Sequence, residues 1–253
     1  MFKKTISFVL IMTVCGLIST TTAQDAPRKI WEYIMLTPNN THLKVLGENM
    51  RKHNQKYHSE GPYKAFVFNV VTGDDVGKIV WQMGPINYSD LDSRPSENGH
   101  DDDWRDNILP YVKYQSDSEY WNTHLDVSLL DEMDTETVSH PILMVRFLNI
   151  ADGQSYKVGG IMKQISATVK SIPNHSPWGA FDNQFLQGDR GRHLATVRYL
   201  KTWSELDGEN NFKGYYEKVH GNNSWDAYQK DLSTTFSDTW DVILQYNAHM
   251  SGK

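Results

Sequence analysis

The histidines near the end of one amphipathic segment are the residues of this chain best suited to chemistry. His53 falls on the apolar face of a helix expected over residues 41–57, where Leu46, Met50 and Tyr57 recur at helical spacing. An imidazole on such a face is a core residue with a hydrogen-bond partner, a ligand contact, or a metal or haem ligand. It is also a candidate general base, so we take His53 as the candidate catalytic residue.

His58 follows five residues later. Neighbours on one helix face lie three or four residues apart, so this spacing does not predict a metal site shared with His53. His58 is either a solvated helix end or a ligand contact, and it joins the candidate ligand-binding residues. No Gly-rich phosphate loop, serine nucleophile elbow or His-Glu-x-x-His motif occurs. We therefore expect no metal and no cofactor.

A polar cluster follows in the chain and contains Asp90, Asp92, Arg94, His100 and the run Asp101–Asp103. Acidic residues favour helix N-termini, which explains the aspartates as caps. Arg94 has no such explanation: its guanidinium either pairs with the neighbouring aspartates or holds a ligand carboxylate. Asp92 and Arg94 are candidate ligand-binding residues.

Three large apolar side chains complete the candidate site. Trp81 and Met83 lie on one face of an expected hairpin strand, and Trp104 lies on a later helix. They are either core residues or the walls of a flat aromatic pocket. We include all three among the candidate ligand-binding residues.

The elements that must position these residues occur twice. Residues 62–92 return as residues 177–207 with nearly constant spacing, which predicts an internal duplication. The second copy has Ile165 where the first has His53. The polar and aromatic candidates are therefore concentrated in the first copy.

Each copy reads β-α-β-β-α-β, the order of a ferredoxin-like unit with helices on one face of an antiparallel sheet. We predict an α+β fold in which two such repeats pack sheet to sheet as an intramolecular pseudo-dimeric barrel. The predicted divisions are a first repeat over residues 24–125, a linker over 126–140 and a second repeat over 141–253. Strands are expected at 30–37, 65–72, 78–83, 120–125, 142–150 and 240–246, and helices at 41–57 and 156–172, with a last helix carrying Trp225, Leu232 and Phe236.

Residues 1–23 read as a secretory signal, with Lys3 and Lys4 before an apolar core and a small-residue cleavage site near Ala23. The sequence thus predicts a secreted or periplasmic protein. The only cysteine, Cys15, lies in this segment, so no disulfide is expected in the exported chain. The formal net charge of −6, with no basic run, argues against nucleic acid as a partner. No later stretch is apolar enough to span a membrane.

The element order and the repeated hairpin resemble the dimeric α+β barrel superfamily in a tandem form. The closer likeness is to NIPSNAP-like and antibiotic-biosynthesis-monooxygenase-like domains, over residues 28–250. It extends to exported bacterial proteins of unassigned function that share the stretch from Met83 to Pro95. The resemblance implies a site between the sheet and its helices. Its members include cofactor-free oxygenases, haem enzymes and lactone isomerases.

Two functions remain open at this point. The first is an exported binding protein that holds a small, partly aromatic or apolar ligand in a cleft of the first repeat. The second is a cofactor-free monooxygenase-like or isomerase-like enzyme with His53 as general base. We expect a monomer with pseudo-twofold symmetry or a weak homo-oligomer, because a chain that covers its own sheet needs no partner.

Overall fold

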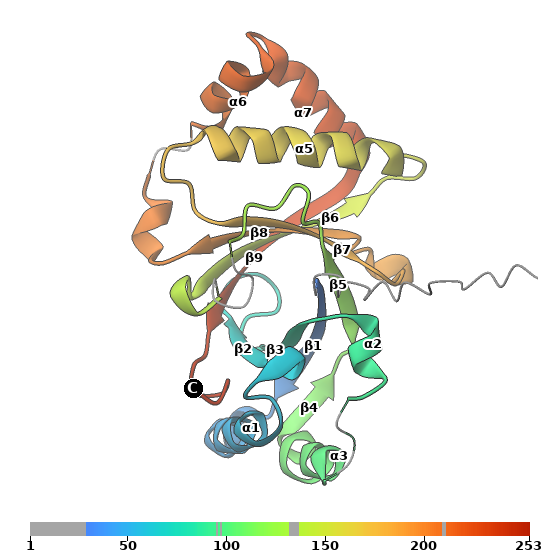
Figure 1. The fold of residues 1–253 in the computed structure, drawn as a ribbon, viewed down its shortest axis with the longest axis vertical. Coiled ribbons are helices and arrows are strands. Elements are labelled where there is room, and N and C mark those ends of the chain that lie inside the picture. Colours follow the sequence, from blue (N-terminus) through green and yellow to red (C-terminus); the bar gives the residue numbers. More distant parts are fainter. Residues whose placement is uncertain (1–28, 95, 97, 132–136, 209–210) are drawn as a thin grey trace, which may run out of the picture.

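Antiparallel strands close into one barrel in the computed structural model, which describes residues 29–94, 96, 98–131, 137–208 and 211–253 (Figure 1). The sheet order is β3-β2-β9-β6-β8-β7-β5-β1-β4, and an additional β3–β1 pairing closes the ring. The strands are β1 (Ile30–Pro38), β2 (Ala65–Val70), β3 (Ile79–Ile86), β4 (Val112–Gln115), β5 (Glu119–Thr123), β6 (Ile142–Ile150), β7 (Trp178–Asn183), β8 (Leu194–Leu200) and β9 (Phe236–Tyr246).

The two halves of the chain contribute strands in the same relative order, β5-β1-β3-β2 and β9-β6-β8-β7. They join edge to edge through the β2–β9 and β5–β7 pairings, so neither half leaves a free sheet edge in the ring. β4 adds outside the ring and pairs with the last residues of β1, Leu36 to Pro38. The expected α+β barrel is confirmed at this level.

Alternation along β1 separates two apolar layers. Trp31 and Tyr33 point into the barrel, where they pack with residues such as Phe147 from the other half. Ile30 and Ile34 point outward under the helices. The period of two in a strand produces this division, and it also sends Glu32 to the outer face.

Helices cover the outer face of each half (Figure 1). The first half carries α1 (Leu43–Tyr57), the short α2 (Tyr88–Leu91) and α3 (His100–Asp103), and the second carries α5 (Ser155–Ser171), α6 (Phe212–His220) and α7 (Ser224–Thr235). Leu46 and Met50 of α1 are fully buried against the outer layer, as their spacing predicts. No helix of the described ranges has the length and apolarity that crossing a bilayer requires.

Some boundaries differ from expectation for local reasons. Phe236 begins β9, one residue after α7 ends, so it is not part of the last helix. α3 continues as a π-helical turn over Trp104–Ile108 and ends in a 3-10 turn over Leu109–Tyr111, where Pro110 cannot donate a helical hydrogen bond. The expected linker is partly packed: Val127 is buried and Leu129 pairs with Trp178.

The expected signal segment, residues 1–23, lies outside the described residues. The same holds for residues 132–136 of the expected linker.

Candidate functional site

A pocket of about 620 Å³ lies on the outer face of the first half, between the sheet and the segment that follows α2. β1 and β3 provide its floor, and α3 with its π-helical extension provides one wall. By contrast, a cavity inside the barrel measures about 50 Å³, room for a few waters. The outer pocket is lined by Glu32, Ile34, His58, Trp81, Leu91, Asp92, Arg94, Ser96, His100, Asp101, Trp104, Arg105, Leu109, Gln115 and Ser118.

The end of α1 brings two histidines to this pocket. His53 lies one turn before the end of α1 with its side chain fully buried. His58 is the residue just past the helix, at φ −134° and ψ 26°, and its N–H donates to the Asn54 carbonyl at 2.9 Å. Because His58 has left the helix, helical spacing does not set the direction of its side chain. That is why a five-residue separation still brings the two rings together.

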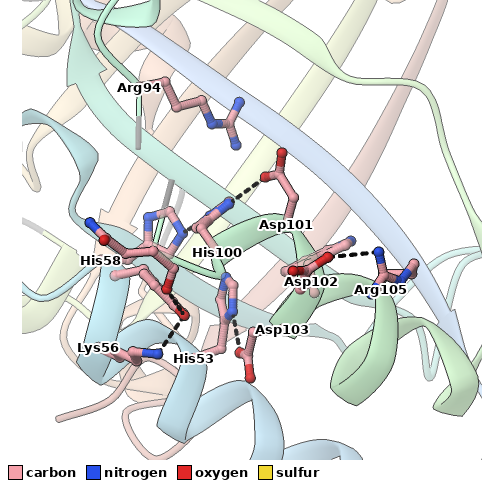
Figure 2. Close-up of polar contacts among 12 residues, drawn as sticks. His53, Lys56, His58, Arg94, His100, Asp101, Asp102, Asp103 and Arg105 are labelled. Carbon is pink, nitrogen blue, oxygen red and sulfur yellow. Dashed lines mark hydrogen bonds and ion pairs between the residues drawn. The ribbon is translucent and has the colours of Figure 1, made fainter. Parts of the chain in front are cut away.

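α3 contributes the third histidine, His100. Gly99 precedes it with φ 81°, a conformation that favours glycine, and this turn directs His100 toward α1. The ring centroids of His53, His58 and His100 lie 5.0 to 5.2 Å apart in pairs. Each ring offers a nitrogen within 4.8 Å of the others (Figure 2). We call these three residues the histidine cluster.

Each ring of the histidine cluster has its Nδ1 beside an oxygen acceptor. His53 Nδ1 lies 2.7 Å from Asp103 Oδ2, and His100 Nδ1 lies 2.7 Å from Asp101 Oδ1 (Figure 2). His58 Nδ1 lies 2.8 Å from the Tyr63 carbonyl oxygen, which can only accept. The Nδ1 atoms are therefore the donors, and the Nε2 atoms carry the lone pairs.

The Nε2 atoms face the interior of the cluster. His58 Nε2 and His100 Nε2 are 3.1 Å apart. His53 Nε2 is buried and has no hydrogen-bond partner among the described residues. A buried nitrogen without a partner costs free energy, so the arrangement calls for something at its centre.

Burial governs the protonation of this site. Desolvation lowers the pKa of His53 to about 4, although the Asp103 carboxylate opposes it. Desolvation, aided by the neighbouring imidazoles, lowers the pKa of His58 to about 3. Burial alone would raise the pKa of Asp103, but hydrogen bonds from His53 and Asn107 outweigh it and lower that pKa. At neutral pH His53 and His58 are thus neutral, beside an ionised Asp103.

Aromatic side chains enclose the histidine cluster. Trp81 from β3 contacts His58 with ring centroids 5.1 Å apart, and Trp104 contacts His53 at 5.3 Å. The two indoles lie 5.7 Å apart at 67° and form an aromatic corner of the pocket. Trp81 Nε1 donates to Asn54 Oδ1 at 3.0 Å, which satisfies its buried N–H.

One expectation was that Arg94 pairs with the neighbouring aspartates, but its partner in the structure is Glu32. Arg94 Nη1 donates to Glu32 Oε2 at 2.9 Å, and the Glu32 side chain is almost fully buried. Glu32 reaches the pocket because it alternates with Trp31 and Tyr33 on β1. The pair places one cation and one anion side by side on the pocket wall.

Of the residues singled out from sequence, His58, Trp81, Asp92, Arg94 and Trp104 line the pocket. His53 lies behind them in the histidine cluster. Met83 is fully buried in the apolar layer under α1 and does not reach the pocket lining.

Sequence reasoning assigns no site role to His100, Asp103 or Glu32. It places His100 and Asp103 in a polar, helix-capping cluster, and it does not single out Glu32 within the strand expected at 30–37. The signal that was available is the pairing of His100 with adjacent carboxylates, a common surrounding for a metal-binding histidine. It also bears on the expectation that no metal binds, which rested on the spacing of His53 and His58 and on the absence of a His-Glu-x-x-His motif.

The second half fills the equivalent region with aromatic rings. Tyr216 of α6 stacks on Tyr228 of α7 with centroids 4.4 Å apart. Phe212 and Trp225 pack on the same apolar cluster, to which Ile165 of α5 also belongs. The polar pocket of the first half is thus matched by an aromatic helix interface in the second.

No protein-family model matches the chain, and no curated protein matches its sequence. Solved structures match its fold. A proposed monooxygenase of Lactobacillus acidophilus NCFM superposes with a TM-score of 0.53 at 8% identity, over 87% of this chain and 94% of that one. A chlorite dismutase variant of Candidatus Nitrospira defluvii gives 0.51 at 8%, over 89% and 94%. A haem-binding protein of Thermus thermophilus gives 0.50 at 8%, over 88% and 93%.

At these identities the likeness concerns the fold alone. The neighbours are dimeric α+β barrel proteins of the monooxygenase and chlorite-dismutase type, with a closed barrel of eight strands. The chain shares with them the closed antiparallel barrel and the helices outside it, and its fold is that of the dimeric α+β barrel proteins.

Proposed function

We propose that the chain is a small-molecule-binding protein whose ligand occupies the pocket of the first half. The observation that carries this proposal is the pocket itself: about 620 Å³ bounded by an indole corner, an arginine and two imidazoles. Small-molecule sites are concave, with apolar walls and a few placed polar groups. A partly aromatic ligand fits these walls, with its ring against Trp104, which is partly exposed, and a polar end toward Arg94.

The asymmetry between the halves supports this location. In the second half, Phe212, Tyr216 and Trp225 pack where the first half keeps polar side chains. Burial of those rings stabilises the fold but leaves no comparable set of titratable groups among the described residues there.

An enzyme of the monooxygenase or isomerase kind is the second candidate. Structural neighbours of this chain include a proposed monooxygenase and an anthrone oxidase-like protein. A general base must reach its proton directly or through one water. His53 is fully buried and lies outside the pocket lining, whereas His58 and His100, although buried, belong to the lining. Under this reading His58 or His100 contacts the ligand, and His53 acts through them.

A thermal-shift screen of small aromatic acids and alcohols tests the binding proposal. A ligand that binds the folded state raises the midpoint of unfolding, by an amount that grows with its concentration. We expect hits on the wild-type chain that weaken by at least about tenfold in Trp104→Ala and Arg94→Leu, since each variant removes one wall of the pocket.

Trp203→Ala is the matched control, because Trp203 is a half-exposed indole in the second half, outside the pocket lining. It should retain every hit. Hits that bind Trp104→Ala and Arg94→Leu as tightly as the wild type would rule the pocket out as the binding site.

Two further inferences concern the evolutionary origin of the two halves and the export of the protein. We infer that its halves are a tandem duplication of a ferredoxin-like unit with a NIPSNAP-like ancestor, since their strand orders correspond.

We also infer export after cleavage near Ala23, on the pattern of residues 1–23. Mass spectrometry of protein secreted from the full chain should find Gln24 at the N-terminus. An unprocessed N-terminus in every fraction would contradict export.

A further inference from the structure

We propose that His53, His58 and His100 form a mononuclear site for a divalent transition-metal ion, with Zn²⁺ as the best-matched ion. The site goes beyond the proposed function, because the ion would bind whether or not a ligand fills the pocket. It rests on three observations: the hydrogen bonds of the Nδ1 atoms, the separation of the rings, and the side from which the cluster can be reached.

The first observation is that three lone pairs converge on one point. The acceptors Asp103, Tyr63 and Asp101 hold the Nδ1 hydrogens, so each Nε2 is a free base. Two such lone pairs at 3.1 Å repel each other unless a cation lies between them. Metal-binding histidines characteristically donate their second N–H to a carboxylate or a backbone carbonyl, which is the pattern of all three rings here.

The second observation is the size of the triangle. Tetrahedral Zn²⁺ with Zn–N bonds of about 2.05 Å places its nitrogens about 3.3 Å apart and its imidazole centres about 5.2 Å apart. The observed ring centres are 5.0, 5.2 and 5.2 Å apart, and the His58–His100 nitrogens are 3.1 Å apart. The three ligand nitrogens lie within 4.8 Å of one another, so closing each pair to about 3.3 Å takes a shift of at most about 1.5 Å.

The third observation is that the buried cluster borders the pocket on one side, although His58 and His100 are only 1% and 6% exposed. His53 is shut off by α1 and Trp104, whereas His58 and His100 line the pocket. Three imidazoles with an open fourth position are the ligand set of a catalytic rather than a structural zinc site. The fourth ligand would be a water or an oxygen donor of a pocket ligand, so the site favours compounds with a carboxylate or hydroxyl group.

Haem is a poor match for this ligand set. Haem iron receives four nitrogens from the porphyrin and takes axial ligands from the protein, commonly one histidine. Three imidazoles crowded on one point leave no flat face for a porphyrin. The carboxylates of Glu32, Asp92 and Asp101 in the pocket lining also disfavour an apolar macrocycle.

Titration of the chelator-treated full chain with Co²⁺ and Zn²⁺ tests the site. We expect one ion per chain, the visible ligand-field bands of four-coordinate Co²⁺, and displacement of Co²⁺ by Zn²⁺. His58→Ala and His100→Ala should each weaken Zn²⁺ binding by roughly 100-fold or more, beyond the 10- to 100-fold typical of losing a supporting residue. His175→Ala is the matched control, since His175 lies outside the histidine cluster, and it should bind as the wild type does.

A second measurement avoids any dependence on how the variants fold. In the wild-type chain with ¹⁵N-labelled histidine, Zn²⁺ should shift the Nε2 resonances of His53, His58 and His100 together, and saturate at one equivalent. No uptake of one ion per chain, or equal affinity in folded His100→Ala, would overturn the proposal. Nε2 resonances that do not shift on addition of Zn²⁺ would also overturn the proposal. The 3.1 Å contact between His58 Nε2 and His100 Nε2 would then be a hydrogen bond with a shared proton. Haem uptake that is lost in His100→Ala would also overturn the proposal.

Discussion

His58 Nε2 and His100 Nε2 face each other at 3.1 Å, although the two residues are 42 positions apart in the chain. Each ring is held from behind through Nδ1, one by a backbone carbonyl and the other by a carboxylate. The contact is thus prearranged by its surroundings and does not result from two mobile side chains meeting. Such preorganisation is what a binding centre requires.

The Asp103 carboxylate behind the His53 ring should contribute to the affinity of the histidine cluster for Zn²⁺. Asp103→Asn keeps the shape of the side chain but removes the charged acceptor from His53 Nδ1. We expect this variant to weaken Zn²⁺ binding by about 10- to 100-fold, because the acceptor orients the ring and raises its basicity. Competition with a chromophoric chelator measures the change.

Asp102→Asn provides the neighbouring control. Asp102 is exposed and pairs with Arg105 at the surface, without a contact to the histidine cluster. The Asp102→Asn variant should bind Zn²⁺ with the same affinity as the wild-type chain. An equal loss in both variants would mean that general charge, and not the contact with His53, sets the affinity.

A buried ion pair beside the barrel interior should contribute strongly to stability. Arg192 donates to both oxygens of Glu119 at 2.8 and 2.9 Å, and its guanidinium lies 3.9 Å from the Phe147 ring centre. Both side chains are largely buried. Glu119→Gln should lower the free energy of unfolding by about 3 kcal/mol, because it leaves a buried charge uncompensated. Urea titration measures this loss.

The exposed pair between Arg190 and Asp117 serves as the comparison. Asp117→Asn should change stability by less than about 1 kcal/mol, since water screens that pair. Similar losses for Asp117→Asn and Glu119→Gln would show that burial does not decide the strength of these pairs.

The pair between His124 and Asp182 should give stability a pH dependence. A 2.7 Å contact with Asp182 raises the pKa of His124, and hydrogen bonds from His124 and Asn122 lower the pKa of Asp182 against the opposing effect of burial. The contribution of His124 is full below its unfolded pKa of about 6.5 and is lost as the pH rises through its higher folded value. That of Asp182 is full above about 3.9 and is lost as the pH falls through its lower folded value.

His124→Gln should therefore cost the most stability between these limits. Because His124 is partly exposed, we expect a loss of no more than about 1 kcal/mol near pH 5.5, shrinking toward zero by about pH 9. Urea titrations at both pH values measure the difference. His175→Gln is the comparison variant, because the ring of His175 contacts a backbone carbonyl and not a carboxylate. A loss for His124→Gln that is constant with pH would point to packing and not to charge.

Gly84 lies where the backbone of β3 meets β1, and it should tolerate no side chain. Its φ is 142°, and an added Cβ would lie 2.7 Å from the Ile30 carbonyl oxygen. Gly84→Ala should lower the free energy of unfolding by about 2 kcal/mol or more, from backbone strain together with this clash. Thermal unfolding measures it.

Gly77→Ala separates the two causes. Gly77 also has a positive φ, 86°, but no atom lies within 4 Å of its added Cβ. Only the strain of about 1–2 kcal/mol should remain. Equal losses at both positions would mean that the close approach to Ile30 is relieved by movement of the strands.

Local pattern was enough to predict most elements of the fold. A strand was expected at residues 30–37, and Trp31 and Tyr33 of that strand line the barrel. Helical spacing of Leu46 and Met50 indicated the buried face of α1. Both follow from the period of a single element, which the chain carries within a few residues.

Pairings and contacts between distant segments were beyond the reach of local pattern. β4 was not expected, because four exposed or half-exposed residues acquire strand geometry only by pairing with the end of β1. Arg94 reaches across 62 positions to Glu32, and no sequence spacing indicates that partner.

The sequence by itself determined that His53 stands on a buried helix face and that carboxylates surround His100. Only the tertiary structure decided that His58, which follows the end of α1, and His100 of α3 would lie beside His53. It also decided that the Nε2 atoms of the three rings would face the interior of one cluster. The physical reason is that periodicity orients a side chain on its own element, whereas the packing of elements sets which side chains share a point in space.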